Sequence, residues 1–226
     1  MILGFLTTAS LSPMPKSIIT TSQVQEALAK LTRVVDNKAF YAALNAANRL
    51  TDIAENAGCA LKSGYRLIRI DDRNNAPDVN FEIALIDDIE LSIVYYSMIF
   101  STILNGRPTA QIWTWRSYKT NHWEELKAVI SKASFNYIIK RFDILISNDL
   151  EVGSGEFFWL RQISNSIAEG YSVYYYKGLS TELQPISSQA EFYHFVDQCW
   201  SGSHDQHQCL ALISRSPLFP PLLEER

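Results

Sequence analysis

The sequence predicts an α/β (α+β) fold, with helices on one mixed sheet that is antiparallel in its N-terminal part and more parallel in its C-terminal part. Apolar residues first recur at helical spacing and then, after residue 64, alternate as they do in strands. Beyond residue 140, strand-like and helix-like stretches follow one another, which favours parallel connections. The composition, 47% hydrophobic and 19% charged, excludes a disordered, collagen-like or coiled-coil chain.

Two helices are expected in the first part of the chain. Ser22 followed by Gln25 resembles a capping box, and the apolar spacing after it predicts a helix over residues 22–35. A second apolar stripe predicts a helix that begins near Lys38 and is ended by Gly58.

Strand patterns begin at residues 1–6 and return at residues 65–70 and 80–86, where a polar turn between two runs predicts an antiparallel pair. The apolar run at residues 92–104 is shorter than the roughly 20 residues of a membrane-spanning helix, so we expect it in the core. The later elements are expected in the order strand 111–115, helix 123–131, strand 142–146, helix 156–169, strand 171–176, helix 189–200 and strand 209–213.

The chain of 226 residues is expected to form a single domain over residues 1–216, followed by a Pro-rich, irregular tail at 217–226. With 20 basic and 24 acidic residues the net charge is −4, so general nucleic-acid binding is not expected. Three cysteines make no disulfide framework at this length, and we expect a cytoplasmic protein without membrane association.

One strand-to-helix turn carries the clearest binding motif. Gly153 and Gly155 lie between the expected strand 142–146 and the next helix, where glycines permit close ligand approach and helix N–H groups can hold a phosphate. Together, this turn and the order of the expected helices and strands resemble the GNAT superfamily of N-acetyltransferases. In that family an Arg/Gln-x-x-Gly-x-Gly/Ala turn holds the pyrophosphate of acetyl-CoA. Leu150 stands here where that family has Arg or Gln.

The resemblance implies an acyl-CoA-dependent N-acyltransferase, active or degenerate, whose cofactor acetyl-CoA contacts Gly153, Ser154 and Gly155. It also implies that Tyr193 is the general acid for the departing thiolate. Asp149 lies at a strand end, where α/β sheets bind ligands, and could polarise a substrate amine. A cofactor cleft is then expected between the strands at residues 143–149 and 171–176.

A purely structural interpretation of the same turn stays open. Asp149, Glu151 and Glu156 surround it, and carboxylates at a helix N-terminus stabilise the helix but repel a diphosphate. In that interpretation the glycines make a tight connection and Glu156 caps the helix.

A cluster of histidines and cysteines near the C-terminus has a composition suited to tetrahedral zinc. Its members are Cys199, His204, His207 and Cys209. The spacing matches no standard zinc finger, so a polar loop between two core cysteines and a thiol–imidazole pair remain alternatives.

Aromatic side chains share strand faces in two places, Trp113 with Trp115 and Tyr174 with Tyr176. Core packing is one interpretation of these faces. The other is an interface, so the alternative function is that of a non-catalytic binding or regulatory protein that engages another macromolecule, such as a protein partner, through them.

Overall fold

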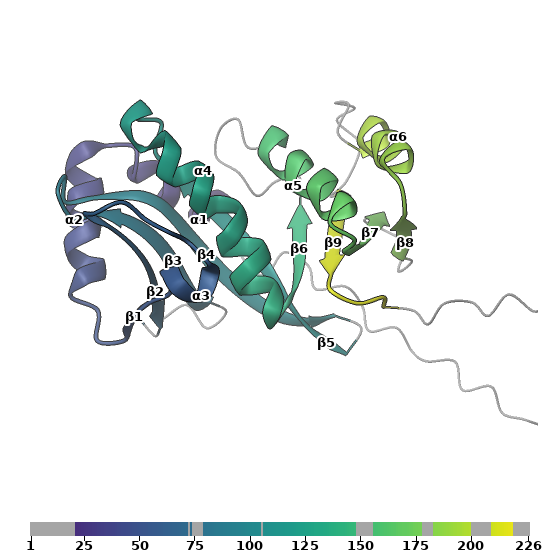
Figure 1. Cartoon of the computed structure of the whole chain (residues 1–226), viewed down its shortest axis with the longest axis horizontal. Helices are drawn as coiled ribbons and strands as arrows, with labels where there is room; N and C mark the ends of the chain where they lie inside the picture. The colour runs from purple at the N-terminus through teal and green to yellow at the C-terminus, as the bar shows by residue number, and fades with distance from the viewer. Residues whose placement is uncertain are drawn as a thin grey trace, which may run out of the picture.

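The computed structural model describes residues 21–71, 73, 79–104, 106–147, 156–177, 183–199 and 209–218. Within these ranges, six α-helices surround one mixed sheet of nine strands (Figure 1), which confirms the expected α/β class. The helices are α1 (Thr21–Lys30), α2 (Val34–Asn45), α3 (Ala54–Ala57), α4 (Trp123–Lys132), α5 (Glu156–Ala168) and α6 (Gln189–Cys199). The strands are β1 (Leu50–Asp52), β2 (Tyr65–Asp71), β3 (Val79–Asp87), β4 (Ser92–Leu104), β5 (Arg107–Arg116), β6 (Asp143–Ser147), β7 (Ser172–Lys177), β8 (Leu183–Ile186) and β9 (Cys209–Ser214).

The strands lie in the order β1-β2-β3-β4-β5-β6-β9-β7-β8. Neighbours from β1 to β5 are antiparallel, as the sequence predicts for the N-terminal part, including the β2–β3 pair. Then β5 pairs with β6 in parallel, and this is the single parallel pair among the described strands.

The expectation of a more parallel C-terminal part is wrong. β9 lies between β6 and β7 and is antiparallel to both. The cause is a strand that the sequence reading missed, β8, which pairs antiparallel with β7. Because β8 reverses the direction of the chain before α6, the crossover through α6 brings β9 into the sheet in the opposite direction.

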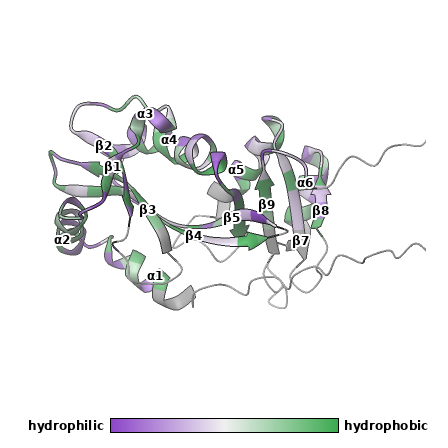
Figure 2. Cartoon of the chain, turned by 90° about the horizontal axis from the view of Figure 1, so that it is seen from below, coloured by the Kyte–Doolittle hydropathy of each residue, from purple (hydrophilic) through white to green (hydrophobic). Residues whose placement is uncertain are grey.

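Helices cover both faces of the sheet: α1 and α2 lie on one face, and α3, α4 and α5 lie on the other (Figure 2). The side chains of β5 therefore alternate between two cores. Ile112 packs in the core that includes α4, whereas Trp113 and Trp115 pack in the core that includes α1 and α2. Burial on both faces also explains why residues 92–100 of β4 are all buried, as expected for a core strand.

The boundaries of the first helices differ from expectation. α1 ends at Lys30, and Arg33 has an extended backbone before α2 begins. The expected second helix is interrupted: α2 ends at Asn45, and the residues that follow form β1, which pairs with β2. The short α3 comes next and is ended by Gly58 in a left-handed conformation, φ +70°. In the described ranges no helix has the length and apolar content needed to cross a bilayer. The expected strand at residues 1–6 and most of the expected tail lie outside the described residues.

Candidate functional site

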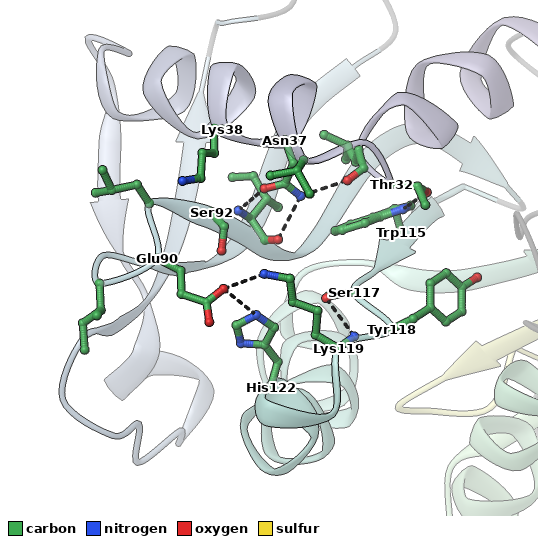
Figure 3. Close-up of a pocket in the computed structure, with 15 residues that line it drawn as sticks. Thr32, Asn37, Lys38, Glu90, Ser92, Trp115, Ser117, Tyr118, Lys119 and His122 are labelled. Carbon is green, nitrogen blue, oxygen red and sulfur yellow. Dashed lines mark hydrogen bonds and ion pairs between the residues drawn. The ribbon is translucent and has the colours of Figure 1, made fainter.

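A cavity of about 650 Å³ opens where three connections meet at one end of β4 and β5 (Figure 3). Its walls come from the α1–α2 turn, the hairpin turn between β3 and β4, and the β5–α4 connection. Clefts of a few hundred Å³ with apolar walls and a few polar groups are the usual sites for small molecules. The residues that line it are Leu31, Thr32, Val34, Asn37, Lys38, Ile89, Glu90, Leu91, Ser92, Ile93, Trp115, Ser117, Tyr118, Lys119 and His122.

Asn37 fixes the α1–α2 turn to the sheet. Its side chain is 7% exposed; Nδ2 donates to the backbone oxygens of Leu31 (3.0 Å) and Ile93 (3.1 Å), and Oδ1 accepts from the Ile93 N–H (2.7 Å). The same turn is held to β5 as well, because the Trp115 indole N–H donates to Thr32 Oγ1 (3.3 Å). Two walls of the cavity are thus held at a defined spacing.

The β3–β4 hairpin is shaped by Asp87 and by a residue with unusual backbone geometry. Asp87 Oδ1 accepts from the backbone N–H groups of Ile89 (2.8 Å) and Glu90 (3.0 Å), and Leu91 has φ +53°. Gly64 lies beside the turn, where an added Cβ would be 2.6 Å from the Ile89 side chain. The hairpin therefore needs both a left-handed residue and a neighbour without a side chain.

Ser92, the first residue of β4, points into the cavity (Figure 3). The residue is 7% exposed, and its Oγ has no hydrogen-bond partner among the described residues. Buried hydroxyl groups nearly always have a partner, because burying one without a hydrogen bond costs about 1–3 kcal/mol. An unpartnered hydroxyl in the wall of a cavity is therefore the group most available to a bound molecule.

Glu90 and Lys119 form an ion pair across the lower part of the cavity (Figure 3). Lys119 Nζ lies 2.6 Å from Glu90 Oε2, and Asn121 Nδ2 donates to Glu90 Oε1 (2.7 Å). The hydrogen bond from Lys119 is the main reason that the pKa of Glu90 lies below its ordinary value. Both charges are thus neutralised within the protein.

His122 completes this wall and is 1% exposed. Its Nδ1 lies 3.0 Å from the Tyr65 hydroxyl, and its Nε2 lies 3.7 Å from Glu90 Oε2. Burial lowers the pKa of His122 more than the carboxylates of Glu90 and Asp87 raise it, so the imidazole is neutral at pH 7. Burial also raises the pKa of Tyr65.

The ligand atoms of Asp87, Glu90 and His122 lie within 4.8 Å of one another, which raises the question of a metal ion. The geometry argues against it, since Asp87 approaches Nδ1 of the ring and Glu90 approaches Nε2 on the other side. One metal ion cannot be coordinated by both nitrogens of the same ring. The Lys119 ammonium also lies against Glu90, where it would repel a cation. We assign structural roles to these residues: Glu90 pairs with Lys119, Asp87 holds the hairpin amides, and His122 is a neutral buried side chain.

The residues expected to hold acetyl-CoA, Gly153, Ser154 and Gly155, lie outside the described residues, as do Asp149 and Leu150. Of the predicted histidine and cysteine cluster, His204 and His207 are also outside, and Cys199 and Cys209 are described only as the end of α6 and the start of β9. The zinc interpretation therefore stays a prediction.

Tyr193 is 63% exposed on α6, which packs against α5 and β8 at the outer edge of the sheet. The cleft expected between the strands at 143–149 and 171–176 is not formed, because β9 pairs with both β6 and β7 and fills that place. The strands that separate are β5 and β6, which pair only at Thr109–Asp143, Ala110–Ile144 and Gln111–Leu145.

The aromatic faces are packing surfaces where the structure describes them. Trp113, Trp115 and Tyr174 are 2%, 6% and 5% exposed. The side chain of Tyr176 lies outside the described residues.

The cavity itself was missed by the sequence reading. Its one available signal was the dense polar turn that contains Asp87 and Glu90, since the other groups come from segments far apart in the chain. Comparison with protein-family models, curated proteins and solved structures found no match to this chain.

Proposed function

We propose that this chain is an acyl-CoA-dependent N-acyltransferase of GNAT-like architecture, or a degenerate relative that keeps the ligand site. The observation that carries the proposal is the separation of β5 from β6. The two parallel strands pair over residues 109–111 only, although β5 continues to Arg116. Parallel strands that diverge toward their carboxyl ends leave an unpaired sheet edge, where α/β proteins bind ligands.

The register of β4 and β5 shows which backbone groups face this opening. The Ser117 N–H donates to the Val94 oxygen (2.8 Å), so in the antiparallel ladder every second residue from Ser117 backwards is bonded to β4. The N–H and C=O groups of Thr114 and Arg116 therefore point to the other side, beyond the last pair with β6.

An unpaired strand edge binds extended molecules that carry amides, because they add to the sheet like another strand. The pantetheine arm of coenzyme A is such a molecule. Acetyl-CoA would supply an acyl group on a thiol leaving group: a C–N bond to an amine forms, the C–S bond breaks, and the proton that the amine gives up is balanced by the proton that the departing thiolate takes up as it becomes CoA thiol. The Thr114 N–H can donate to an amide or thioester carbonyl, which is how backbone groups stabilise developing negative charge in acyl transfer.

The test is the amide NMR spectrum of the ¹⁵N-labelled protein titrated with acetyl-CoA, with 3′,5′-ADP as the control that lacks pantetheine. We expect the amides of Thr114 and Arg116 to shift with acetyl-CoA and not with 3′,5′-ADP, while those of β1 stay unchanged. The same spectra identify the strand-to-helix turn that contacts the pyrophosphate of acetyl-CoA. It is the turn at residues 150–155, as the resemblance implies, or the turn at residues 117–122 after β5. No shift in β5 at millimolar acetyl-CoA would refute the proposal.

Transfer itself is measured as release of CoA thiol in the presence of a panel of primary amines. Thiol release that depends on an amine identifies an active enzyme. Binding in β5 without thiol release identifies the degenerate form.

A further inference from the structure

We propose that the cavity between the α1–α2 turn, the β3–β4 hairpin and the β5–α4 connection binds a small organic acid, a monoanion with a carboxylate and an apolar body. This proposal does not depend on acyl transfer, because Ser92 and Lys38, which carry it, are not part of the β5–β6 opening. It rests on a polar group and a cation that have no partner among the described residues, and on an apolar rim.

Ser92 supplies the polar group. Its Oγ is buried, has no partner among the described residues and faces the cavity from the first residue of β4 (Figure 3). The backbone around it is held by Asn37, which is bonded to both the N–H and the C=O of Ile93. A hydroxyl fixed in this way donates well to a carboxylate oxygen.

Lys38 supplies the charge. Three charged side chains line the cavity, and two of them, Glu90 and Lys119, neutralise each other at 2.6 Å. Lys38 extends from α2 toward the end of β4 where Ser92 lies (Figure 3), and it forms no ion pair or hydrogen bond with the described residues. His122 is neutral, and Asp87 behind it is occupied by the hairpin amides.

One unpaired cation beside one hydroxyl suits a single carboxylate better than a phosphate dianion, which needs more positive charge. It also disfavours an amine ligand, because Glu90 already accepts from Lys119 and Asn121. The charges that line the cavity therefore favour a monoanionic carboxylate over a phosphate or an amine.

The rim of the cavity selects an apolar body. Four large apolar side chains in its wall are exposed to solvent, which leaves apolar area available for burial by a ligand. They are Val34 (62%), Ile89 (77%), Leu91 (50%) and Tyr118 (62%). Trp115 also lines the cavity and is 6% exposed.

The experiment is a calorimetric titration of the full chain with three compounds that differ only in their head group: 4-phenylbutanoate, 4-phenylbutan-1-ol and 4-phenylbutan-1-amine. We expect the carboxylate to bind about tenfold more tightly than the alcohol and the amine not to bind. The Lys38→Met variant should lose about tenfold in affinity for the carboxylate and little for the alcohol. Lys127→Met, which removes the same charge from an exposed position of α4 outside the cavity, should bind as the wild type does.

Ser92→Ala separates a binding role from a structural one. Removing an unpartnered buried hydroxyl should raise the midpoint of urea unfolding, whereas removing a ligand contact should weaken carboxylate binding about threefold. A lower unfolding midpoint with unchanged affinity would show that the hydroxyl serves the fold.

Three results would overturn the proposal: no binding of the carboxylate at 10 mM ligand, equal binding of alcohol and carboxylate, or full affinity in Lys38→Met. Each can occur whether or not acetyl-CoA binds at β5. A failure here therefore leaves the acyltransferase proposal to its own test.

Discussion

Replacing Asn37 with alanine tests whether this one side chain fixes the cavity. Asn37 is 7% exposed and makes three hydrogen bonds to the backbone of Leu31 and Ile93. Each such bond contributes about 1 kcal/mol net, and its loss leaves a buried backbone group without a partner. We expect Asn37→Ala to lower the free energy of unfolding by about 3 kcal/mol, which for a chain of this size lowers Tm by about 6–12 °C.

The measurement is urea unfolding followed by tryptophan fluorescence, since Trp113 and Trp115 are buried and will be exposed on unfolding. Asn45→Ala is the matched control on the same helix. Asn45 is exposed and bonds to Tyr41 O (3.3 Å) and to Arg66 (2.8 Å). The control should cost less than about 1 kcal/mol. If the two variants lose equal stability, Asn37 does not hold the α1–α2 turn in the way described.

Two further predictions concern the groups beside the cavity. Because burial lowers the folded-state pKa of His122, the unfolded chain takes up this proton first as the pH falls from 7 to 5, and the stability of the fold decreases. The decrease in the urea midpoint between pH 7 and pH 5 should be smaller in His122→Gln than in the wild type. An equal decrease in both proteins would contradict this. Gly64→Ala should lower the free energy of unfolding by about 2 kcal/mol, because Gly64 has φ +91° and the new Cβ would contact the Ile89 side chain. Adding Ile89→Ala should recover only part of this loss in the urea midpoint. Full recovery would show that the backbone conformation costs the alanine nothing.

The sequence was most informative where local pattern and tertiary structure agree. The alternation at residues 65–70 and 80–86 predicted the β2–β3 pair because the two strands are close in the sequence and pair with each other directly. Gly58 was expected to end the helix that begins near Lys38; it does end a helix, the short α3, since it adopts a left-handed conformation that other residues disfavour. Such signals lie within a few residues of the structure they determine.

The direction of the C-terminal strands could not be obtained in this way. It depends on β8, a strand of four residues that contains Pro185, and prolines are tolerated only at edges or bulges of a sheet. β8 is the edge strand, so the proline fits, but its short pattern resembles a loop in the sequence. Because β8 was missed, the predicted direction of β9, the strand that follows it, was reversed.

Unusual local geometry lies close to the cavity, and such geometry often marks functional sites. The left-handed Leu91, the crowded Gly64 and the unpartnered Ser92 all lie at or beside the β3–β4 hairpin. The backbone of Leu91 and the buried hydroxyl of Ser92 each cost stability at this turn, whereas the buried strands beneath follow the rules of sheet and core packing. Hairpin turns commonly require a left-handed residue, so the turn itself explains Leu91 and Gly64, whereas it does not explain the Ser92 hydroxyl, which has no partner among the described residues. The same geometry sets Ser92 at the cavity wall opposite the Glu90–Lys119 pair, where its hydroxyl would contact the proposed ligand (Figure 3).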